Sequence, residues 1–243
     1  MHSRMIHIGR MLLVALLVMS CTSCTRWREA KMVVERADSL LVHKIVTRDT
    51  AALLSAINTL DGPLGHVFAR QDLAKAYYFM GRNFYYLNDF STAADYYILC
   101  DRMNPSDPIY KGRINSCMGY LCKQDSCFAE ALVFYERSSC AFKERGNEWY
   151  YAHNLVNVAE QYVNLREYAK ADSVLDIAND YDIDSAYYAR IVDVRALALF
   201  NQQLYDSALV CLLSIKDYPR PIEAKCYICN VMHVWILWSR WYL

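Results

Sequence analysis

Three residue positions recur together four times along this chain of 243 residues, and their spacing constrains the fold more than any other feature. A small residue comes first, an aromatic residue follows nine positions later, and an alanine follows three positions after that. All three series advance by 38, 40 and 37 residues. Such a period, built from helical segments, is typical of stacked helical hairpins, so we predict an all-α fold, an α-solenoid of helix-turn-helix repeats. The four sets are Gly81, Phe90 and Ala93; Gly119, Phe128 and Ala131; Ala159, Tyr168 and Ala171; and Ala196, Tyr205 and Ala208.

The first twenty residues have the pattern of an export signal. Arg4 and Arg10 form a basic start, and the apolar run Met11–Met19 follows. This run is too short to cross a bilayer as a stable helix, but it is long enough for a secretory signal. We therefore predict that residues 1–20 are a signal peptide and are removed from the mature protein.

A cysteine follows the expected cleavage site. Residues 17–21, Leu-Val-Met-Ser-Cys, resemble a bacterial lipobox, in which the cysteine is lipidated and becomes the mature N-terminus. The resemblance makes residues 1–20 a lipoprotein signal peptide, Cys21 the lipidation site and residues 21–29 a tether in the bacterial cell envelope, facing the periplasm. Two alternatives stay open, namely lipidation at Cys24 and an ordinary signal with an incidental cysteine.

Charge and motifs argue against two large classes of function. Removal of residues 1–20 leaves 24 basic and 26 acidic residues, a net charge of −2, which speaks against nucleic acid as a partner. The chain has no HExxH motif, no phosphate-binding glycine-rich loop and no GxSxG motif. We predict that it is not an enzyme and that it has no catalytic residues, metal site or cofactor. Its remaining histidines are scattered, at His43, His66, His153 and His233.

Ten cysteines in an exported chain would allow a disulfide framework, but their placement favours buried thiols. Cys226 and Cys229 form a C-x-x-C motif without the second ligand pair that a zinc site needs. Four others fall inside expected helices, where a small apolar side chain packs well: Cys100, Cys117, Cys122 and Cys211.

Apolar spacing and turn residues divide the chain into segments. Two helices, at 30–46 and 51–60, precede the repeats, and Asp61-Gly62-Pro63 ends the second. The first repeat has helices at 68–87 and 90–103. Gly81 weakens the first of these, which predicts that the partner helix approaches closely at a residue without a side chain. The predicted segments are an N-terminal hairpin or cap at 30–66, four repeats at 67–218 and an unpaired C-terminal apolar helix at 219–243.

The first repeat resembles the tetratricopeptide repeat. That family has a large, a small and an aromatic residue in its first helix, then an aromatic and small residues in its second helix and a closing proline. The matching residues are Tyr77, Met80, Gly81, Phe84, Phe90, Ala93, Tyr97, Cys100 and Pro105. The later repeats lack the proline, and Arg195 stands where an apolar residue is usual. All exceed the family's usual length of about 34 residues, so we place the extra residues in loops or in longer second helices.

The resemblance covers residues 68–218 and implies where a ligand would bind. In this family the first helices line a concave groove that takes a peptide segment of a partner. On the corresponding face we expect a basic and aromatic N-terminal half and a mixed C-terminal half; each residue taken singly is also consistent with an ordinary solvated face. The residues are Lys75, Tyr78, Arg82, Tyr85, Tyr86, Arg113, Tyr120, Lys123, His153, Asn164 and Arg190.

The C-terminal segment departs from the usual polar cap of a repeat array. Residues 224–243 resemble another first helix without a second one, and they carry Trp235, Trp238 and Trp241. Four interpretations stay open: docking on a partner, self-association, contact with the membrane interface, and truncation of a longer chain.

The whole layout resembles the tetratricopeptide lipoproteins abundant in Bacteroidetes. It implies a non-catalytic adaptor or scaffold, lipid-anchored in the envelope, that binds a peptide segment of another envelope protein. Two alternatives remain: the truncated periplasmic sensory half of a transmembrane regulator, and an outer-membrane assembly scaffold.

Overall fold

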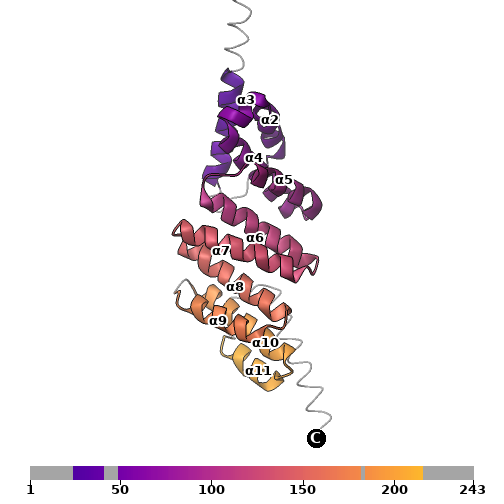
Figure 1. The fold of residues 1–243 in the computed structure, drawn as a ribbon, viewed down its shortest axis with the longest axis vertical. Helices are drawn as coiled ribbons and strands as arrows, with labels where there is room; N and C mark the ends of the chain where they lie inside the picture. The colour runs from indigo at the N-terminus through magenta and orange to yellow at the C-terminus, as the bar shows by residue number, and fades with distance from the viewer. Residues whose placement is uncertain (1–23, 41–48, 182–183, 216–243) are drawn as a thin grey trace, which may run out of the picture. The chain divides into compact units, whose positions relative to one another are not determined.

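The computed structural model describes residues 24–40, 49–181 and 184–215, and all regular secondary structure in these ranges is helical (Figure 1). The prediction of an all-α fold is therefore confirmed. The signal peptide, Cys21, His43, His233 and the C-terminal segment 219–243 lie outside the described residues. The chain forms two compact units, with the boundary between Tyr110 and Lys111.

The first unit begins with a helix of residues 24–40. Residues 24–29, which were predicted to belong to a tether, are helical; they contain no glycine or proline that would stop the helix. Ala30, Val34 and Ala37 form its buried stripe. The other helices of this unit are α2 (Thr50–Leu60), α3 (Pro63–Phe68), α4 (Arg70–Tyr86), α5 (Phe90–Arg102) and the first residues of α6 (Pro108–Gln124).

The second unit contains the rest of α6 and a succession of antiparallel hairpins. Helix α8 packs against α7, α9 and α10, and α10 packs in turn against α9 and α11. A large cluster of buried residues is formed by α8, α9 and α10, with Val156, Leu175 and Ile191 among its members. The helices are α7 (Phe128–Glu144), α8 (Glu148–Asn164), α9 (Tyr168–Asn179), α10 (Ser185–Asn201) and α11 (Tyr205–Leu213).

Four hairpins share one plan, in which α4, α6, α8 and α10 are the first helices. Each of these has 17 residues. Three residues then lead to the second helix, and the second helices have 13, 17, 12 and 9 residues. The uneven period of the sequence therefore arises in the second helices and in the loops that follow them.

The turn inside each hairpin has the same backbone conformation. Its middle residue has a positive φ, between 60° and 64°, at Asn88, Ser126, Arg166 and Gln203. The N–H of the next residue donates to a carbonyl five residues earlier, as from Cys127 to Cys122 at 2.8 Å. This is the Schellman motif, which normally favours glycine at the positive-φ position.

The contact between paired helices explains the recurring small residue. A Cβ on Gly81 would lie 2.7 Å from the Tyr97 ring, and one on Gly119 would lie 3.0 Å from the Tyr135 ring. The predicted close approach at Gly81 is therefore confirmed. In the third and fourth hairpins the small residue is alanine, and leucine replaces the tyrosine, giving the pairs Ala159–Leu175 and Ala196–Leu212 within shared clusters.

Buried hydrogen bonds also join paired helices. The Cys100 thiol donates to the Ala74 carbonyl at 2.9 Å, and the Ser138 hydroxyl donates to the Gly112 carbonyl at 2.7 Å. The third hairpin has Ala178 at the corresponding position. There the hydroxyl of Tyr187, from α10, contacts the carbonyls of Ala178 at 2.7 Å and Ala152 at 3.4 Å.

Candidate binding surface

In the first unit, Lys75 lies in a polar cluster with Asp38 and Tyr110. The Lys75 ammonium pairs with one carboxylate oxygen of Asp38 at 2.7 Å, and the Tyr110 hydroxyl donates to the other at 2.5 Å. The Lys75 nitrogen also lies 5.4 Å from the centre of the Tyr110 ring. Since its charge is balanced by a neighbouring carboxylate, Lys75 serves chiefly to join α4 to the helix of residues 24–40.

Arg82 lies one helical turn from two tyrosines of α4. Its guanidinium carbon is 6.0 Å from the Tyr78 ring and 5.4 Å from the Tyr86 ring, and it donates to the Tyr86 hydroxyl at 3.0 Å. Tyr86 is 54% exposed and packs edge-on against Tyr85. Arg82, Tyr85 and Tyr86 therefore remain candidates for ligand contact on the first unit.

Tyr78 is not a groove residue, contrary to the prediction. Only 3% of it is exposed, because its ring packs against Phe79, Tyr97 and Tyr110. The face of α4 at this position is covered by aromatic residues of α5 and α6. We therefore remove Tyr78 from the candidate set.

In the second unit, predicted residues from α6, α8 and α10 contact side chains of the neighbouring first helix. Lys123 pairs with Glu160 at 2.7 Å, and Arg190 donates to the Asn157 amide oxygen at 2.8 Å. The Arg113 guanidinium lies 5.4 Å from the Tyr150 ring centre. These contacts link three successive first helices through their polar faces.

Two further predicted residues of the second unit lie on the same first helices. Tyr120 is half-buried on α6. Asn164 ends α8 and donates to Gln161 on its own helix at 3.2 Å. Because this hydrogen bond stays within one helix, Asn164 has weaker support as part of a continuous binding surface.

An aromatic cluster at the start of α8 adds a residue that the sequence prediction missed. Trp149 is 40% exposed, and its ring stacks on His153 with centroids 3.9 Å apart. Tyr150 lies edge-on to Trp149 at 4.8 Å, and Tyr187 lies 5.0 Å from His153. The spacing of four residues between Trp149 and His153 places both on one face of a helix, and this could have identified the tryptophan.

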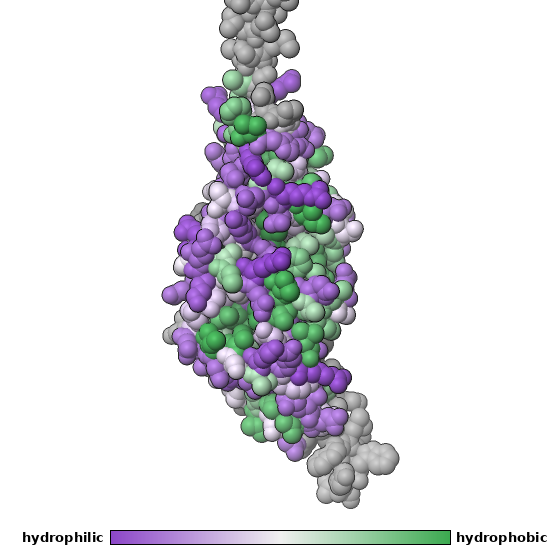
Figure 2. All heavy atoms as spheres, viewed as in Figure 1, coloured by the Kyte–Doolittle hydropathy of each residue, from purple (hydrophilic) through white to green (hydrophobic). Residues whose placement is uncertain are grey.

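The predicted lysines and arginines of these faces differ in their contacts: Arg82 and Arg113 lie against aromatic rings, and Arg190 donates to a neutral amide. Both predicted lysines, Lys75 and Lys123, pair with carboxylates of neighbouring helices. Such pairs contribute no net charge, so they offer little attraction for an acidic segment. Figure 2 shows hydrophobic residues scattered among hydrophilic ones on the visible face.

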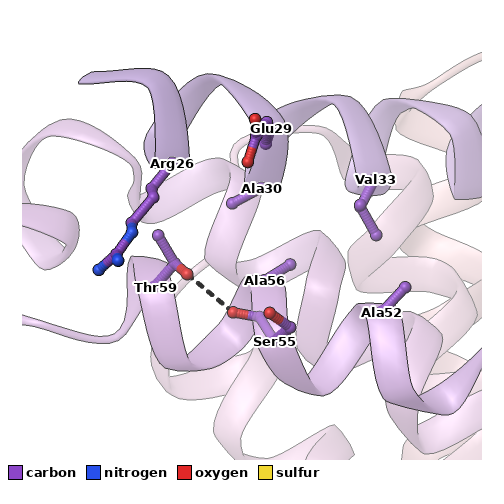
Figure 3. A pocket seen from close by; sticks show the side chains of 8 residues that line it. All are labelled: Arg26, Glu29, Ala30, Val33, Ala52, Ser55, Ala56 and Thr59. Carbon is purple, nitrogen blue, oxygen red and sulfur yellow. Dashed lines mark hydrogen bonds between the residues drawn. The ribbon is translucent and has the colours of Figure 1, made fainter. Parts of the chain in front are cut away.

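A separate hollow of about 500 Å³ lies in the first unit between the helix of residues 24–40 and α2 (Figure 3). Most of its lining residues have small side chains, including Ala30, Ala52 and Ala56. Arg26 and Glu29 stand at its edge, and the Thr59 hydroxyl donates to the Ser55 carbonyl at 2.9 Å (Figure 3). The described residues that line the hollow include no histidine or cysteine.

One carboxylate in the first unit bonds to both a histidine and a tyrosine. Asp61 contacts His66 at 2.6 Å, and it accepts a hydrogen bond from Tyr77 at 2.9 Å. The hydrogen bond with His66 is the main cause that lowers the pKa of Asp61, and burial raises the pKa of Tyr77. The three residues connect the end of α2 with α3 and α4. Within the described residues, no group of three or more metal-binding side chains gathers.

The cysteines predicted as buried thiols differ in their exposure. Cys100 is buried, and burial raises its pKa. Cys117, Cys122 and Cys211 are half-buried. Burial also raises the pKa of Cys122 and Cys211.

Comparison with known proteins leaves the family open. No protein-family model matches the chain, and the search of curated proteins gives no match. Within the ranges that the structure describes, no helix combines the length and apolar character of a membrane span.

Proposed function

We propose that this protein is a non-catalytic interaction adaptor, built as a tetratricopeptide-like α-solenoid and attached to the bacterial envelope by a lipid on Cys21. It binds a peptide segment of another envelope protein through the faces of its first helices. The observation that carries this proposal is the connected set of side chains on α6, α8 and α10. Arg113, Trp149, His153 and Arg190 belong to this set.

The shared plan of the hairpins supports a binding role. Equal first helices and equal turns place corresponding residues at corresponding points of successive helices. Repeated helical pairs of this kind provide extended surfaces for other chains. Arg and Trp are also the residue types that most often dominate the energy of protein interfaces.

The pairing of the two lysines with carboxylates narrows the chemistry that we expect of the partner. Lys75 and Lys123 are matched by Asp38 and Glu160, so a client gains little from acidic residues placed opposite these two lysines. Trp149 offers an exposed ring beside the imidazole of His153. We expect apolar and aromatic side chains of the client to pack here, with polar groups at the rim.

Crosslinking and pull-down of the lipidated protein from its native envelope test this proposal. The informative variant is Trp149→Ala, and Ile177→Ala is its matched control because Ile177 is 48% exposed but lies on the second helix α9. We expect a client captured by the wild type and by Ile177→Ala to be lost from Trp149→Ala, with all three proteins equally folded. Retention by Trp149→Ala would contradict binding through the α8 face.

The membrane attachment has its own test. Metabolic labelling with a radioactive fatty acid should mark the wild-type protein and fail to mark Cys21→Ala. Cys24→Ala is the control and should keep its label. Label that persists in Cys21→Ala and disappears in Cys24→Ala would move the anchor to Cys24.

A further inference from the structure

Two cysteines lie at the two ends of the turn between α6 and α7. The N–H of Cys127 donates to the carbonyl of Cys122 at 2.8 Å, and Ser126 between them has a φ of 60°. These features make Cys122 and Cys127 the two ends of a Schellman motif. Side chains at these two positions frequently contact each other, so the backbone brings the two thiols to the same side of the turn.

The two thiols differ in accessibility. Cys127 is exposed at the N-cap of α7, and its sulfur lies 3.7 Å from the Asp125 carbonyl oxygen. Cys122 is half-buried and packs against the cluster of Ala131 and Tyr135. Burial is the main cause that raises the pKa of Cys122, and the proximity of Cys127 adds to it. An oxidant from solution would therefore meet Cys127 first.

The other hairpin turns have the same backbone but no pair of thiols. The corresponding residues are Phe84 and Asp89, Tyr162 and Glu167, and Leu199 and Leu204. The turn from α6 to α7 thus combines a common geometry with an uncommon pair of side chains.

We propose that Cys122 and Cys127 form a redox-active pair that closes to a disulfide by exchange with a disulfide oxidant. The Cys127 thiolate attacks the oxidant, forms a mixed disulfide and releases one thiolate. The Cys122 thiolate then attacks the Cys127 sulfur and displaces the second thiolate. The protein loses two electrons and two protons, and the oxidant is reduced to two thiols.

The closed form would fix the turn covalently at the point where α6 passes into α7. This inference does not depend on the proposed adaptor function. Export, however, would place the pair in a compartment where disulfides persist.

Peptide mapping of the full-length protein tests the pairing. The reduced protein is incubated with oxidised glutathione, alkylated and digested with trypsin without reduction. Because Arg113, Lys123 and Arg137 are cleavage sites, the disulfide should join peptide 114–123 to peptide 124–137. The linked product should have lost two hydrogen atoms. Fragment ions should place the link at Cys122 rather than Cys117, and a link to Cys117 would overturn the proposal.

Trapping of the intermediate tests the order of the two steps. In Cys122→Ser, glutathione should accumulate on Cys127 several-fold above the wild type, because no second thiol displaces it. Cys140→Ser is the control and should still form the link; Cys140 is exposed on α7 but lies about 20 Å along the helix from Cys127. Equal and lasting glutathione on Cys127 in the wild type and in Cys122→Ser would overturn the proposal.

Discussion

The first two hairpins and the last two fill the same space between their helices in opposite ways. The first two combine glycine on one helix with tyrosine on the other, as in Gly81–Tyr97 and Gly119–Tyr135. The last two combine alanine with leucine at the corresponding positions. Where the first helix has alanine instead of the smaller glycine, the second helix has leucine instead of the larger tyrosine. The comparison teaches that the combined volume at the contact is maintained, while the residue at each position varies.

The buried hydrogen bonds show the same kind of replacement. Cys100 and Ser138 bond from a second helix to the carbonyl of its own first helix. Where Ala178 removes that donor, the Tyr187 hydroxyl of the following first helix lies 3.4 Å from the corresponding carbonyl, that of Ala152, and donates at the shorter distance of 2.7 Å to the carbonyl of Ala178 itself. A buried donor is therefore still present at this place, but it comes from the fourth hairpin and joins that hairpin to the third.

The largest effect is expected from filling the glycine position of the first hairpin. Gly81→Leu should destabilise the protein by about 3 kcal/mol, because even a Cβ would lie 2.7 Å from the Tyr97 ring. Denaturant unfolding followed by circular dichroism measures this. Gly62→Ala is the control and should change little, since a Cβ on Gly62 would meet no heavy atom within 4 Å. An unchanged unfolding midpoint for Gly81→Leu would contradict the close contact between Gly81 and the Tyr97 ring.

The next effect concerns the tyrosine that substitutes for a missing donor. Tyr187→Phe should cost about 2 kcal/mol, because it removes a buried hydroxyl that contacts two carbonyls. Tyr188→Phe is the matched control, since Tyr188 is 43% exposed on the same helix, and it should be nearly neutral. Thermal unfolding of the two variants measures the difference. Equal stability would mean that the Tyr187 hydroxyl does not replace the donor of the earlier hairpins.

A smaller gain is expected at the turns that all hairpins share. Ser126→Gly should stabilise the protein by about 1 kcal/mol, because Ser126 has a φ of 60° and glycine adopts this conformation without a steric penalty. Gly146→Ala is the reciprocal change at φ 69° and should destabilise by a similar amount. The midpoint of denaturant unfolding, measured for each variant and for the wild type, tests both changes. A loss of stability in Ser126→Gly would show that the serine side chain contributes more than the backbone strain costs.

The smallest effect is a pH dependence in the first unit. The pKa of Asp61 is lower in the folded protein than its ordinary value of 3.8, so folding favours its ionised form. Its contribution is present above that ordinary value and disappears as the pH falls through the lowered pKa. The wild type should therefore lose more stability than Asp61→Asn between about pH 5 and pH 2. Parallel acid titrations of the two proteins measure this, and identical curves would contradict the role of Asp61.

Much of the fold was predictable because its signals are local. The series at Gly81, Gly119, Ala159 and Ala196 predicted the number and the register of the hairpins, and the first residues of α4 to α11 follow the same offsets, whereas the ends of the second helices do not. The start of the first helix was missed, because the polar residues at 24–29 have no apolar stripe of their own. Helix α3 was missed as well, because Pro63 was interpreted as a stop although proline is well tolerated in the first turn of a helix.

The candidate surface was less predictable, because it depends on contacts between distant residues. The sequence identified Lys75 and Lys123 as cations, but their pairing with Asp38 and Glu160 appears only when the helices are packed together. The burial of Tyr78 depends in the same way on rings from α5 and α6. Helical spacing alone gives the face of a residue but not what covers that face.

A double-mutant cycle on the second hairpin tests the central claim most directly. Gly119→Ala and Tyr135→Leu together convert its contact into the alanine–leucine type of the third and fourth hairpins. Each single change should destabilise the protein, since one crowds the contact and the other leaves a cavity. The double variant should recover about 1 kcal/mol relative to the sum of the single changes. Strictly additive losses would contradict the claim that the four hairpins share one contact with compensating volumes.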